Sequence, residues 1–287
     1  MRIISSIQEM QEYTSGICAS RRQIGFVPTM GALHDGHLSL LKQARAVSNT
    51  VVMSIFVNPT QFGKGEDFDK YPRVLERDTE LARNNGCDIL FTPTVEELYP
   101  VGIYKTFVSV KDLSSVMCGI TRPDHFTGVA TIVLKFFNII QPYAAIFGHK
   151  DAQQVIVLKR MVEDLNVPVK IVVAPTMRES DGLALSSRNV YLTPEERAAA
   201  PLIYRGLSQA KTLFEQGITD GVRLRQEIES VYRTSTLFTI EYVSLVDTVS
   251  LNPALTVADR PVLCAIACRT TQSKTRLIDN IVLGGAL

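Results

Sequence analysis

Two histidines at a spacing of three residues, His34 and His37, lie in the segment PTMGALHDGH over residues 28–37, directly after an apolar run. Gly31 and Gly36 in this segment allow a ligand to approach the backbone closely. Imidazoles at the start of a helix can donate hydrogen bonds to phosphoryl oxygens, which the helix dipole also attracts. The pattern predicts a phosphate site that is neither a G-x-G-x-x-G turn nor a P-loop. The alternatives are a plain helix cap with two solvated histidines, and a zinc site, for which His125 and His149 are distant in sequence.

A second candidate segment, FGHKDAQQ over residues 147–154, also follows an apolar run. Lys150 offers a mobile cation for phosphate, and Asp151 offers an acceptor for ribose hydroxyls or for a helix cap. Gln154 lies one helical turn beyond Lys150 and is expected to point the same way toward a polar substrate. An ordinary capped helix with an exposed lysine is the alternative.

Two further polar segments complete the set of candidates. Ser186, Ser187 and Arg188 place two hydroxyls and a guanidinium together in LSSRN, which suits a polyphosphate, although a polar linker has a similar composition. Asn58 and Gln61 in FVNPTQF, residues 56–62, follow a buried run and suit hydroxyl or carboxylate recognition, although a simple turn would also use them.

Alternating apolar runs and amphipathic segments predict the elements that carry these residues. Strands are expected over residues 24–30, 50–58, 87–92, 144–147 and 167–174, with helices over 37–48, 72–85, 128–140 and 150–165. This alternation predicts a parallel sheet with helices on both faces. Because ligands bind at the carboxyl ends of such strands, the candidate segments are expected to meet at one edge of the sheet.

The pattern changes after Pro175. Thr193, Pro194 and Glu196 form a strong helix start, with helices expected over 194–216 and 220–234. Strands are then expected over 239–246, 262–269 and 276–282. A run of helices followed by strands predicts a smaller α+β domain. We therefore expect two domains, over residues 1–176 and 177–287.

Composition narrows the class of protein. The 287 residues include 30 Lys and Arg against 29 Asp and Glu, so the net charge of +1 gives no basic field for nucleic acid or for an anionic membrane. The most apolar stretch, residues 131–147, is interrupted by Lys135 and Pro142 and predicts a buried helix that leads into a strand.

The amino terminus lacks the apolar core of a signal peptide. Five cysteines without C-x-x-C spacing predict no disulfide framework, with Cys264 and Cys268 on one buried strand face. A cytoplasmic protein is expected.

Taken together, the motifs resemble those of the pantoate–β-alanine ligase family, also called the pantothenate synthetases. The resemblance covers nearly the whole chain and rests on PTMGALHDGH, FVNPTQF, YPR (71–73), RPDHFTGV (122–129), GHKDAQQ, DGLALSSRN and RLIDN (276–280). It implies a Rossmann-like nucleotide- and pantoate-binding domain followed by a smaller C-terminal lid domain. It also implies a homodimer that binds ATP with Mg²⁺. The implied reaction joins (R)-pantoate to β-alanine through a pantoyl adenylate and releases AMP and pyrophosphate.

The same resemblance implies a role for each matching residue. His34, His37 and Lys150 would be catalytic, with His37 matching the family's proton donor. Gln61, Gln154 and Asn58 would bind pantoate, and Gln61 would also bind β-alanine. Arg122 and His125 fall in a family motif near the active site, and the Mg²⁺ ligands are not identified. The implied ATP-binding residues are Met30, Gly31, Ala32, Leu33, His34, Asp35, Gly36, His37, Gly148, His149, Lys150, Asp151, Met177, Leu185, Ser186, Ser187 and Arg188.

Three positions depart from the family pattern: Asp124 where glycine is usual, His149 where Glu or Gln is more familiar, and Met177 where a smaller branched residue is common. None of them removes a group that the chemistry needs. Two other interpretations stay open. A different H-x-G-H adenylyltransferase would share the histidines, and a catalytically silent nucleotide-binding protein would share the fold. An RNA-acting protein is disfavoured by the net charge.

Overall fold

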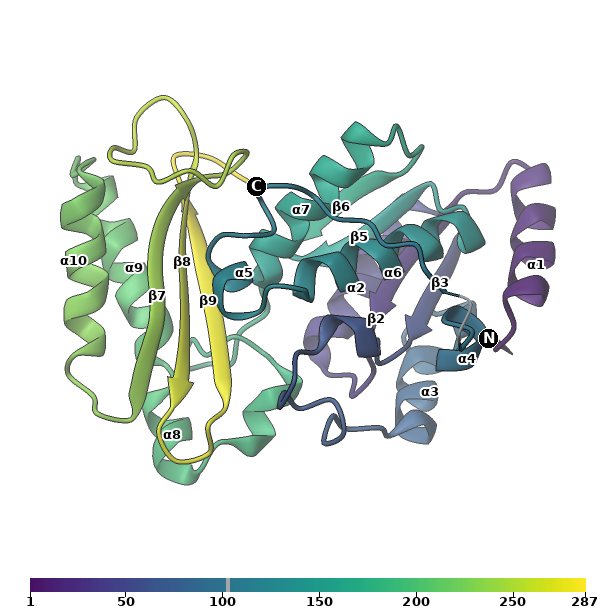
Figure 1. Ribbon diagram of the computed structural model, residues 1–287, viewed down its shortest axis with the longest axis horizontal. Helices are drawn as coiled ribbons and strands as arrows, with labels where there is room; N and C mark the ends of the chain where they lie inside the picture. The colour runs from purple at the N-terminus through teal and green to yellow at the C-terminus, as the bar shows by residue number, and fades with distance from the viewer. Residues whose placement is uncertain (102–103) are drawn as a thin grey trace. The chain divides into compact units, whose positions relative to one another are not determined.

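The computed structural model describes residues 1–101 and 104–287, and the chain forms two compact units (Figure 1). The first unit comprises residues 1–148 and 153–174. The second comprises residues 175–287 together with the short segment 149–152. The predicted domain boundary at residue 176 lies close to the start of the second long segment, but no sequence pattern indicated that residues 149–152 group with it.

The first unit is built on a six-stranded sheet in the order β1-β4-β3-β2-β5-β6, and each neighbouring pair is parallel. The strands are β1 (Arg2–Ile4), β2 (Ile24–Thr29), β3 (Thr50–Ile55), β4 (Ile89–Phe91), β5 (Ala144–Gly148) and β6 (Lys170–Ala174). From β2 to β4 the chain winds toward one edge of the sheet, and from β5 to β6 it winds toward the other. Ligand sites in such sheets lie at the carboxyl ends of the strands where the direction reverses, which here means β2 and β5.

Apolar side chains cover both faces of this sheet, as expected for parallel strands. Val27 of β2 belongs to a core on the face packed by α2, whereas its neighbour Phe26 contacts Phe136 of α6 on the other face, with ring centroids 5.6 Å apart. The unit's helices are α1 (Ile7–Ala19), α2 (Asp35–Val47), α3 (Leu75–Asn84), α4 (Val95–Leu98), α5 (Cys118–Thr121), α6 (His125–Ile140) and α7 (Ala152–Asp164), with a 3-10 turn η1 (Pro59–Gln61). The predicted parallel α/β sheet is confirmed.

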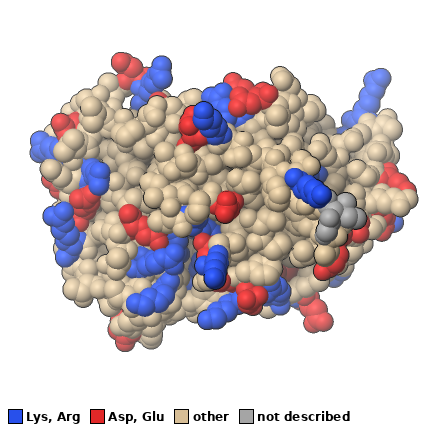
Figure 2. All heavy atoms as spheres, in the orientation of Figure 1, with Lys and Arg blue, Asp and Glu red and all other residues tan. Residues whose placement is uncertain are grey.

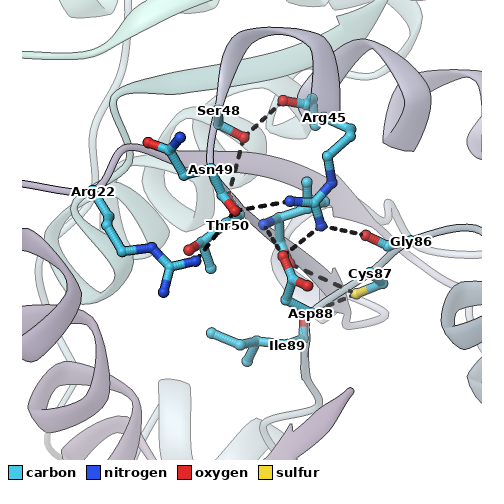
Figure 3. A network of polar contacts seen from close by, with 11 residues as sticks. Arg22, Arg45, Ser48, Asn49, Thr50, Gly86, Cys87, Asp88 and Ile89 are labelled. Carbon is cyan, nitrogen blue, oxygen red and sulfur yellow. Dashed lines mark hydrogen bonds and ion pairs between the residues drawn. The ribbon is translucent and has the colours of Figure 1, made fainter.

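A polar network lies at the amino ends of β3 and β4, at the opposite end of the sheet from the loop after β2 (Figure 3). Arg45, in the last turn of α2, donates to the carbonyls of Asn49 and Gly86 at 2.8 and 2.9 Å, and to Asp88. Asp88 also accepts from the backbone of Val51, at 2.8 Å. These bonds tie α2 to the starts of β3 and β4, so this network is structural.

The second unit carries an antiparallel sheet in the order β7-β8-β9, formed by β7 (Phe238–Asp247), β8 (Val262–Thr270) and β9 (Arg276–Leu283). Its helices are α8 (Pro194–Ala199), α9 (Leu202–Glu215) and α10 (Gly221–Tyr232), with 3-10 turns η2 (His149–Asp151) and η3 (Ser187–Tyr191). Side chains from α9 and α10 pack with the sheet into one core. Cys264 and Cys268 are buried free thiols in that core, as predicted, and burial raises the pKa of each to about 12.

Several predicted elements need correction. The helix expected over residues 194–216 is two helices, because Pro201 lacks the N–H that a continuous helix would need. Strand β1 and helix α1 were not predicted. Residues 150 and 151 lie in a 3-10 turn and not in α7. At Asp124, φ is −95°, so this position does not require the left-handed conformation that favours glycine.

The predicted start of α8 is confirmed as a capping box between Thr193 and Glu196, and it also joins α8 to the turn after β8. The fully buried Glu196 carboxylate accepts from the backbone N–H groups of Thr193, Gln272 and Ser273 at 3.2, 2.8 and 3.0 Å. Burial alone would raise its pKa, but these donors outweigh that effect and lower the pKa to about 2.

We expect Glu196→Gln to lower the free energy of unfolding at pH 7 by about 2 kcal/mol, because charged hydrogen bonds are lost. The depressed pKa means that this stability is full above the ordinary carboxyl pKa of about 4.3 and is lost as the pH falls toward 2. Urea unfolding followed by circular dichroism, from pH 7 down to pH 2, measures both effects. Glu195→Gln, on the exposed side of the same turn, is the matched control; equal behaviour of the two variants would contradict the prediction.

Candidate active site

The loop after β2 turns sharply into α2 through two consecutive residues in the left-handed region. Gly31 has φ +85° and Ala32 has φ +51°. A Cβ on Gly31 would lie 3.0 Å from both the Asp78 carboxylate and the Ile55 side chain, so glycine is required there for space as well as for conformation. A non-glycine residue held at positive φ beside a binding loop indicates that the surrounding structure fixes this turn.

The group that fixes the turn is the carboxylate of Asp78, which comes from α3 and is 1% exposed. Its two oxygens accept from the backbone N–H groups of Ala32 and Leu33, at 2.7 and 2.8 Å. The hydroxyl of Thr29 accepts from the N–H of Gly31 at 3.2 Å and donates to the carbonyl of Ser54. Asp78 was not predicted from the sequence, because an aspartate in a polar helix looks like a solvated residue.

His34 and His37 cap the start of α2 reciprocally. Nδ1 of His34 accepts from the N–H of Gly36 at 3.2 Å, and Nδ1 of His37 accepts from the N–H of His34 at 3.3 Å. The two rings lie 4.1 Å apart between centroids, tilted by 41°. Because each Nδ1 accepts a hydrogen bond, each neutral ring carries its proton on Nε2. Both rings are therefore fixed as Nε2–H donors.

This loop differs from a phosphate-cradling P-loop in how its backbone donors are used. The N–H groups of Gly31, Ala32, Leu33, His34 and Gly36 all have partners within the first unit. A P-loop instead directs such groups at its ligand. The side chains of the two histidines therefore stay the predicted phosphoryl ligands of this turn.

Asn58 and Gln61 lie beside this loop. The amide of Gln61 donates to Sδ of Met30 at 3.2 Å, and its oxygen accepts from Nδ2 of Asn58 at 3.1 Å. Asn58 is 1% exposed and also donates to the carbonyl of Gly128 in α6, while the hydroxyl of Tyr99 donates to it at 2.9 Å. Asn58 therefore orients Gln61, which is itself only part-buried.

Arg122 and His125 hold the backbone of Gln61 from the other side. Nη2 of Arg122 donates to the Gln61 carbonyl at 3.3 Å, and Nδ1 of His125 lies 2.9 Å from the same oxygen. Since a carbonyl oxygen can only accept, that Nδ1 carries the ring proton. The structure thus brings Arg122 and His125 to Gln61, where they act on its main chain.

Glu66 completes this arrangement. Its carboxylate accepts two hydrogen bonds from Arg122, both 2.6 Å long, in a bidentate ion pair. Burial alone would raise the pKa of Glu66, but the hydrogen bonds and positive charge of Arg122 lower it below the ordinary value. Glu66 was not predicted from the sequence either, because its loop carries no regular pattern.

The adjacent glutamines of the GHKDAQQ segment have different surroundings. Gln153 is buried, accepts from the N–H of Cys118 at 3.1 Å, and donates to the carbonyls of Leu113 and Val116. Gln153 is thus a structural residue that ties α7 to the loop before α5. Gln154 remains the candidate ligand, and its predicted alignment with Lys150 stays a prediction, because Lys150 belongs to the second unit.

The second unit holds the other candidates. Lys150 lies in η2, with Nζ 3.9 Å from the carboxylate of Asp151. Ser186 caps η3 by accepting from the N–H of Arg188 at 3.3 Å, and the N–H of Leu185 donates to the carbonyl of Met177. Residues 177–185 form a hairpin, which brings Met177 next to the LSSRN segment. Gly148 ends β5 of the first unit.

The fold and the site define a class of protein. It has a Rossmann-like parallel sheet, and an H-x-G-H pair begins the helix that follows β2. A family model described as pantoate-beta-alanine ligase matches residues 2–282. The chain belongs to that family.

Individual relatives agree. A pantothenate synthetase of Heliobacterium modesticaldum is 52% identical over 283 residues, covering 99% of each chain, and one of Thermotoga neapolitana is 49% identical over 284 residues, covering 99% of this chain and all of the other. A crystal structure of the Thermus thermophilus pantothenate synthetase matches with a TM-score of 0.90 at 45% identity, over 98% of this chain and 99% of the other. The Francisella tularensis ligase, crystallised with β,γ-ATP and β-alanine, matches with a TM-score of 0.79 at 34% identity, over 98% and 97%.

We expect Asp78→Asn to release the loop that carries the histidines. An amide can accept only one of the two backbone N–H groups, so the variant should lose about 1–3 kcal/mol of folding free energy and turn over more slowly by about tenfold or more. Urea unfolding and the rate of AMP formation measure these effects. Asp164→Asn, in an exposed ion pair with Arg160, is the control; an Asp78→Asn variant with wild-type turnover would refute the role.

We expect Glu66→Gln to weaken the hold of Arg122 on Gln61 and to raise the KM for the carboxylate substrate by about tenfold, which corresponds to roughly 1.4 kcal/mol. The affinity for ATP should change by less than about twofold. Steady-state kinetics with each substrate varied in turn separates the two. Glu163→Gln removes an exposed ion pair to Arg160 and serves as the control; an equal rise in both KM values would argue for general damage.

Proposed function

We propose that this protein condenses (R)-pantoate with β-alanine at the expense of ATP, giving pantothenate, AMP and pyrophosphate. The observation that carries the proposal is family membership over residues 2–282, in a chain whose H-x-G-H loop and Gln61 network are both intact. The named relatives are pantothenate synthetases, and one was crystallised with an ATP compound and β-alanine.

The proposed reaction has two balanced steps. A carboxylate oxygen of pantoate attacks the α-phosphorus of ATP, the bond to the bridging oxygen breaks, and pyrophosphate leaves. The amine of β-alanine then attacks the acyl carbon of pantoyl adenylate; the bond to the phosphate oxygen breaks, AMP leaves, and the amine loses a proton. Activation is needed because a carboxylate is a poor electrophile, and the protein contributes position and charge stabilisation.

The proposed catalytic residues are His34, His37 and Lys150. The two imidazoles are held as Nε2–H donors by their reciprocal caps, which suits hydrogen bonding to phosphoryl oxygens as charge builds on the leaving pyrophosphate. Lys150 supplies a cation for the same oxygens. The further proposed ATP contacts are Met30 to Gly36 in the first unit, Gly148 at the end of β5, and His149, Asp151, Met177 and Leu185 to Arg188 in the second.

Gln61 and Gln154 are proposed to bind pantoate, with Gln61 also at the β-alanine position. The support for Gln61 is its fixed orientation, since Asn58 holds its side chain and Arg122 and His125 hold its carbonyl. Asn58 is buried under Gln61, so its proposed contribution to pantoate binding is through that orientation.

Magnesium is proposed to accompany ATP. Within residues 1–101 and 104–287, no group of three or more His, Cys, Asp or Glu side chains is arranged to hold a metal ion. Mg²⁺ at nucleotide sites keeps several waters and binds substrate phosphates with only one or two carboxylates, so the described residues fit an ion of this kind. When bound, it would neutralise phosphate charge; Asp151, whose carboxylate lies 3.9 Å from Nζ of Lys150, is the carboxylate proposed to hold it.

A homodimer is proposed from the family resemblance, a cytoplasmic location is proposed from the composition, and the second unit is proposed to act as the lid domain. In the part of the chain that the structure describes, no helix is both long and apolar enough to cross a membrane. Acidic and basic side chains are interspersed over the face drawn in Figure 2, in keeping with the net charge of +1 and with small-molecule rather than nucleic-acid substrates.

The test is to incubate the purified protein with Mg-ATP, (R)-pantoate and β-alanine and to resolve the nucleotides by chromatography. AMP that forms in step with pantothenate, and only when pantoate is present, is the expected result. ADP in place of AMP would mean an acyl-phosphate route and would overturn the mechanism. ATP binding without turnover would favour a different adenylyltransferase or a silent binder.

We expect His37→Asn and Lys150→Ala each to slow adenylation about 100-fold, a loss of about 3 kcal/mol in transition-state stabilisation. The asparagine can still accept from the N–H of His34 and so keep the helix cap, but it lacks the Nε2–H donor. Single-turnover formation of pyrophosphate measures the step. If both variants stay within about threefold of the wild type, these residues do not stabilise the leaving group.

A further inference from the structure

The motif RLIDN, residues 276–280, has no role in the site described so far, although its last two residues are buried and polar. Asp279 and Asn280 lie side by side on β9, and each is 3% exposed. Adjacent residues of a strand point to opposite faces of a sheet. Each of these side chains therefore meets a different part of the second unit.

Asn280 binds the segment that carries Lys150. Its Nδ2 donates to the carbonyls of His149 and Lys150, at 3.1 and 2.9 Å. Both hydrogens of the amide are thus used on two consecutive peptide groups of η2. This contact explains why residues 149–152 group with the second unit, although they follow β5 in the chain.

Asp279 binds the hairpin that leads to Ser186 and Arg188. Its carboxylate accepts from both terminal nitrogens of Arg178, at 2.6 and 2.8 Å. Arg178 also donates to the carbonyl of Gly182, and its guanidinium lies 3.6 Å from the ring centroid of Tyr204 in α9. The hairpin is therefore fixed at its base by a bidentate ion pair in which Asp279 is buried and Arg178 is partly buried.

The presence of Asp279 and Asn280 in a buried position is not explained by stability alone. A buried ion pair or amide rarely stabilises a fold more than apolar side chains of the same size would. The effect of Asp279 and Asn280 is geometric. One dipeptide on a rigid strand holds two separate polar segments, one with Lys150 and the other with Ser186 and Arg188. The distance between these segments is thereby set inside the second unit.

We propose that Asp279 and Asn280 are positioning residues that fix Lys150 and the Ser186–Arg188 segment as one phosphate-binding group, with Asn280 acting through the main chain at Lys150. The inference rests on the proposed function, because it takes the ligand to be the polyphosphate of a nucleoside triphosphate. It adds residues that touch no substrate themselves.

The test is a double-mutant cycle between Asn280→Asp and Lys150→Ala. In Asn280→Asp a carboxylate oxygen replaces the donor and faces two carbonyl oxygens, so η2 should shift. We expect adenylation to slow by about 10- to 100-fold in this variant. In the Lys150→Ala background the same change should cost less than about threefold, because the group that Asn280 positions is already gone.

A purely structural role for Asn280 would make the two effects multiply, and that outcome would overturn the proposal. If Asn280→Asp does not fold, Asn280→Ser keeps one donor, and the cycle is run with that variant. Asn252→Asp, at an exposed position after β7, is the matched control and should keep wild-type rates.

For the same four proteins of the cycle, calorimetry measures the affinity for a non-hydrolysable ATP analogue. Because binding needs no turnover, this measurement tests the role of Asn280 separately from the proposed reaction. Wild-type protein that binds the analogue but makes no AMP overturns the proposed reaction, and the affinity cycle then decides the role of Asn280. Wild-type protein that binds no nucleotide overturns both.

Discussion

The buried carboxylate of Asp78 is the contact on which the first unit's candidate site depends. A left-handed turn at Gly31 and Ala32 is costly, and it turns the backbone N–H groups of Ala32 and Leu33 inward. Asp78 accepts both of these donors, so the turn is satisfied without water or ligand. The start of α2 then falls where His34 and His37 can cap it, and the caps in turn select the protonated nitrogen of each ring.

Buried polar side chains also hold the candidate segments of the second unit in place. A buried aspartate, Asp279, holds the hairpin before Ser186 through Arg178, and a buried amide, Asn280, holds the backbone at Lys150. In both units several backbone polar groups near the candidate residues are paired within the protein. The side chains proposed to recognise the substrates are imidazole, ammonium, guanidinium and amide groups, which suit a reaction driven by position and charge.

The sequence was informative wherever hydrophobic periodicity decided the outcome. The continuous apolar run at β3 predicted a strand buried on both faces, and Thr193 with Glu196 predicted the start of α8. It failed where a tertiary contact decided. Gln153 and Gln154 are identical side chains in one helix, and only the contacts of Gln153 with the loop before α5 mark it as structural. Asp78 and Glu66 gave no local signal, since their partners lie 45 or more residues away in the chain. Pro201 did carry a signal, the missing N–H, which the strength of the preceding helix start obscured.

The grouping of residues 149–152 with the second unit has a consequence for how this protein can be divided. The chain passes from one compact unit to the other three times, after residues 148, 152 and 174. A single cut after Ala174 would leave Lys150 on the amino-terminal fragment and Asn280 on the other. The amino-terminal fragment would hold the whole first unit together with residues 149–152, and the other fragment would lack that segment of the second unit. Each unit is thus built from segments that are not continuous in the chain, so the two units cannot be exchanged as whole modules by joining single stretches of sequence.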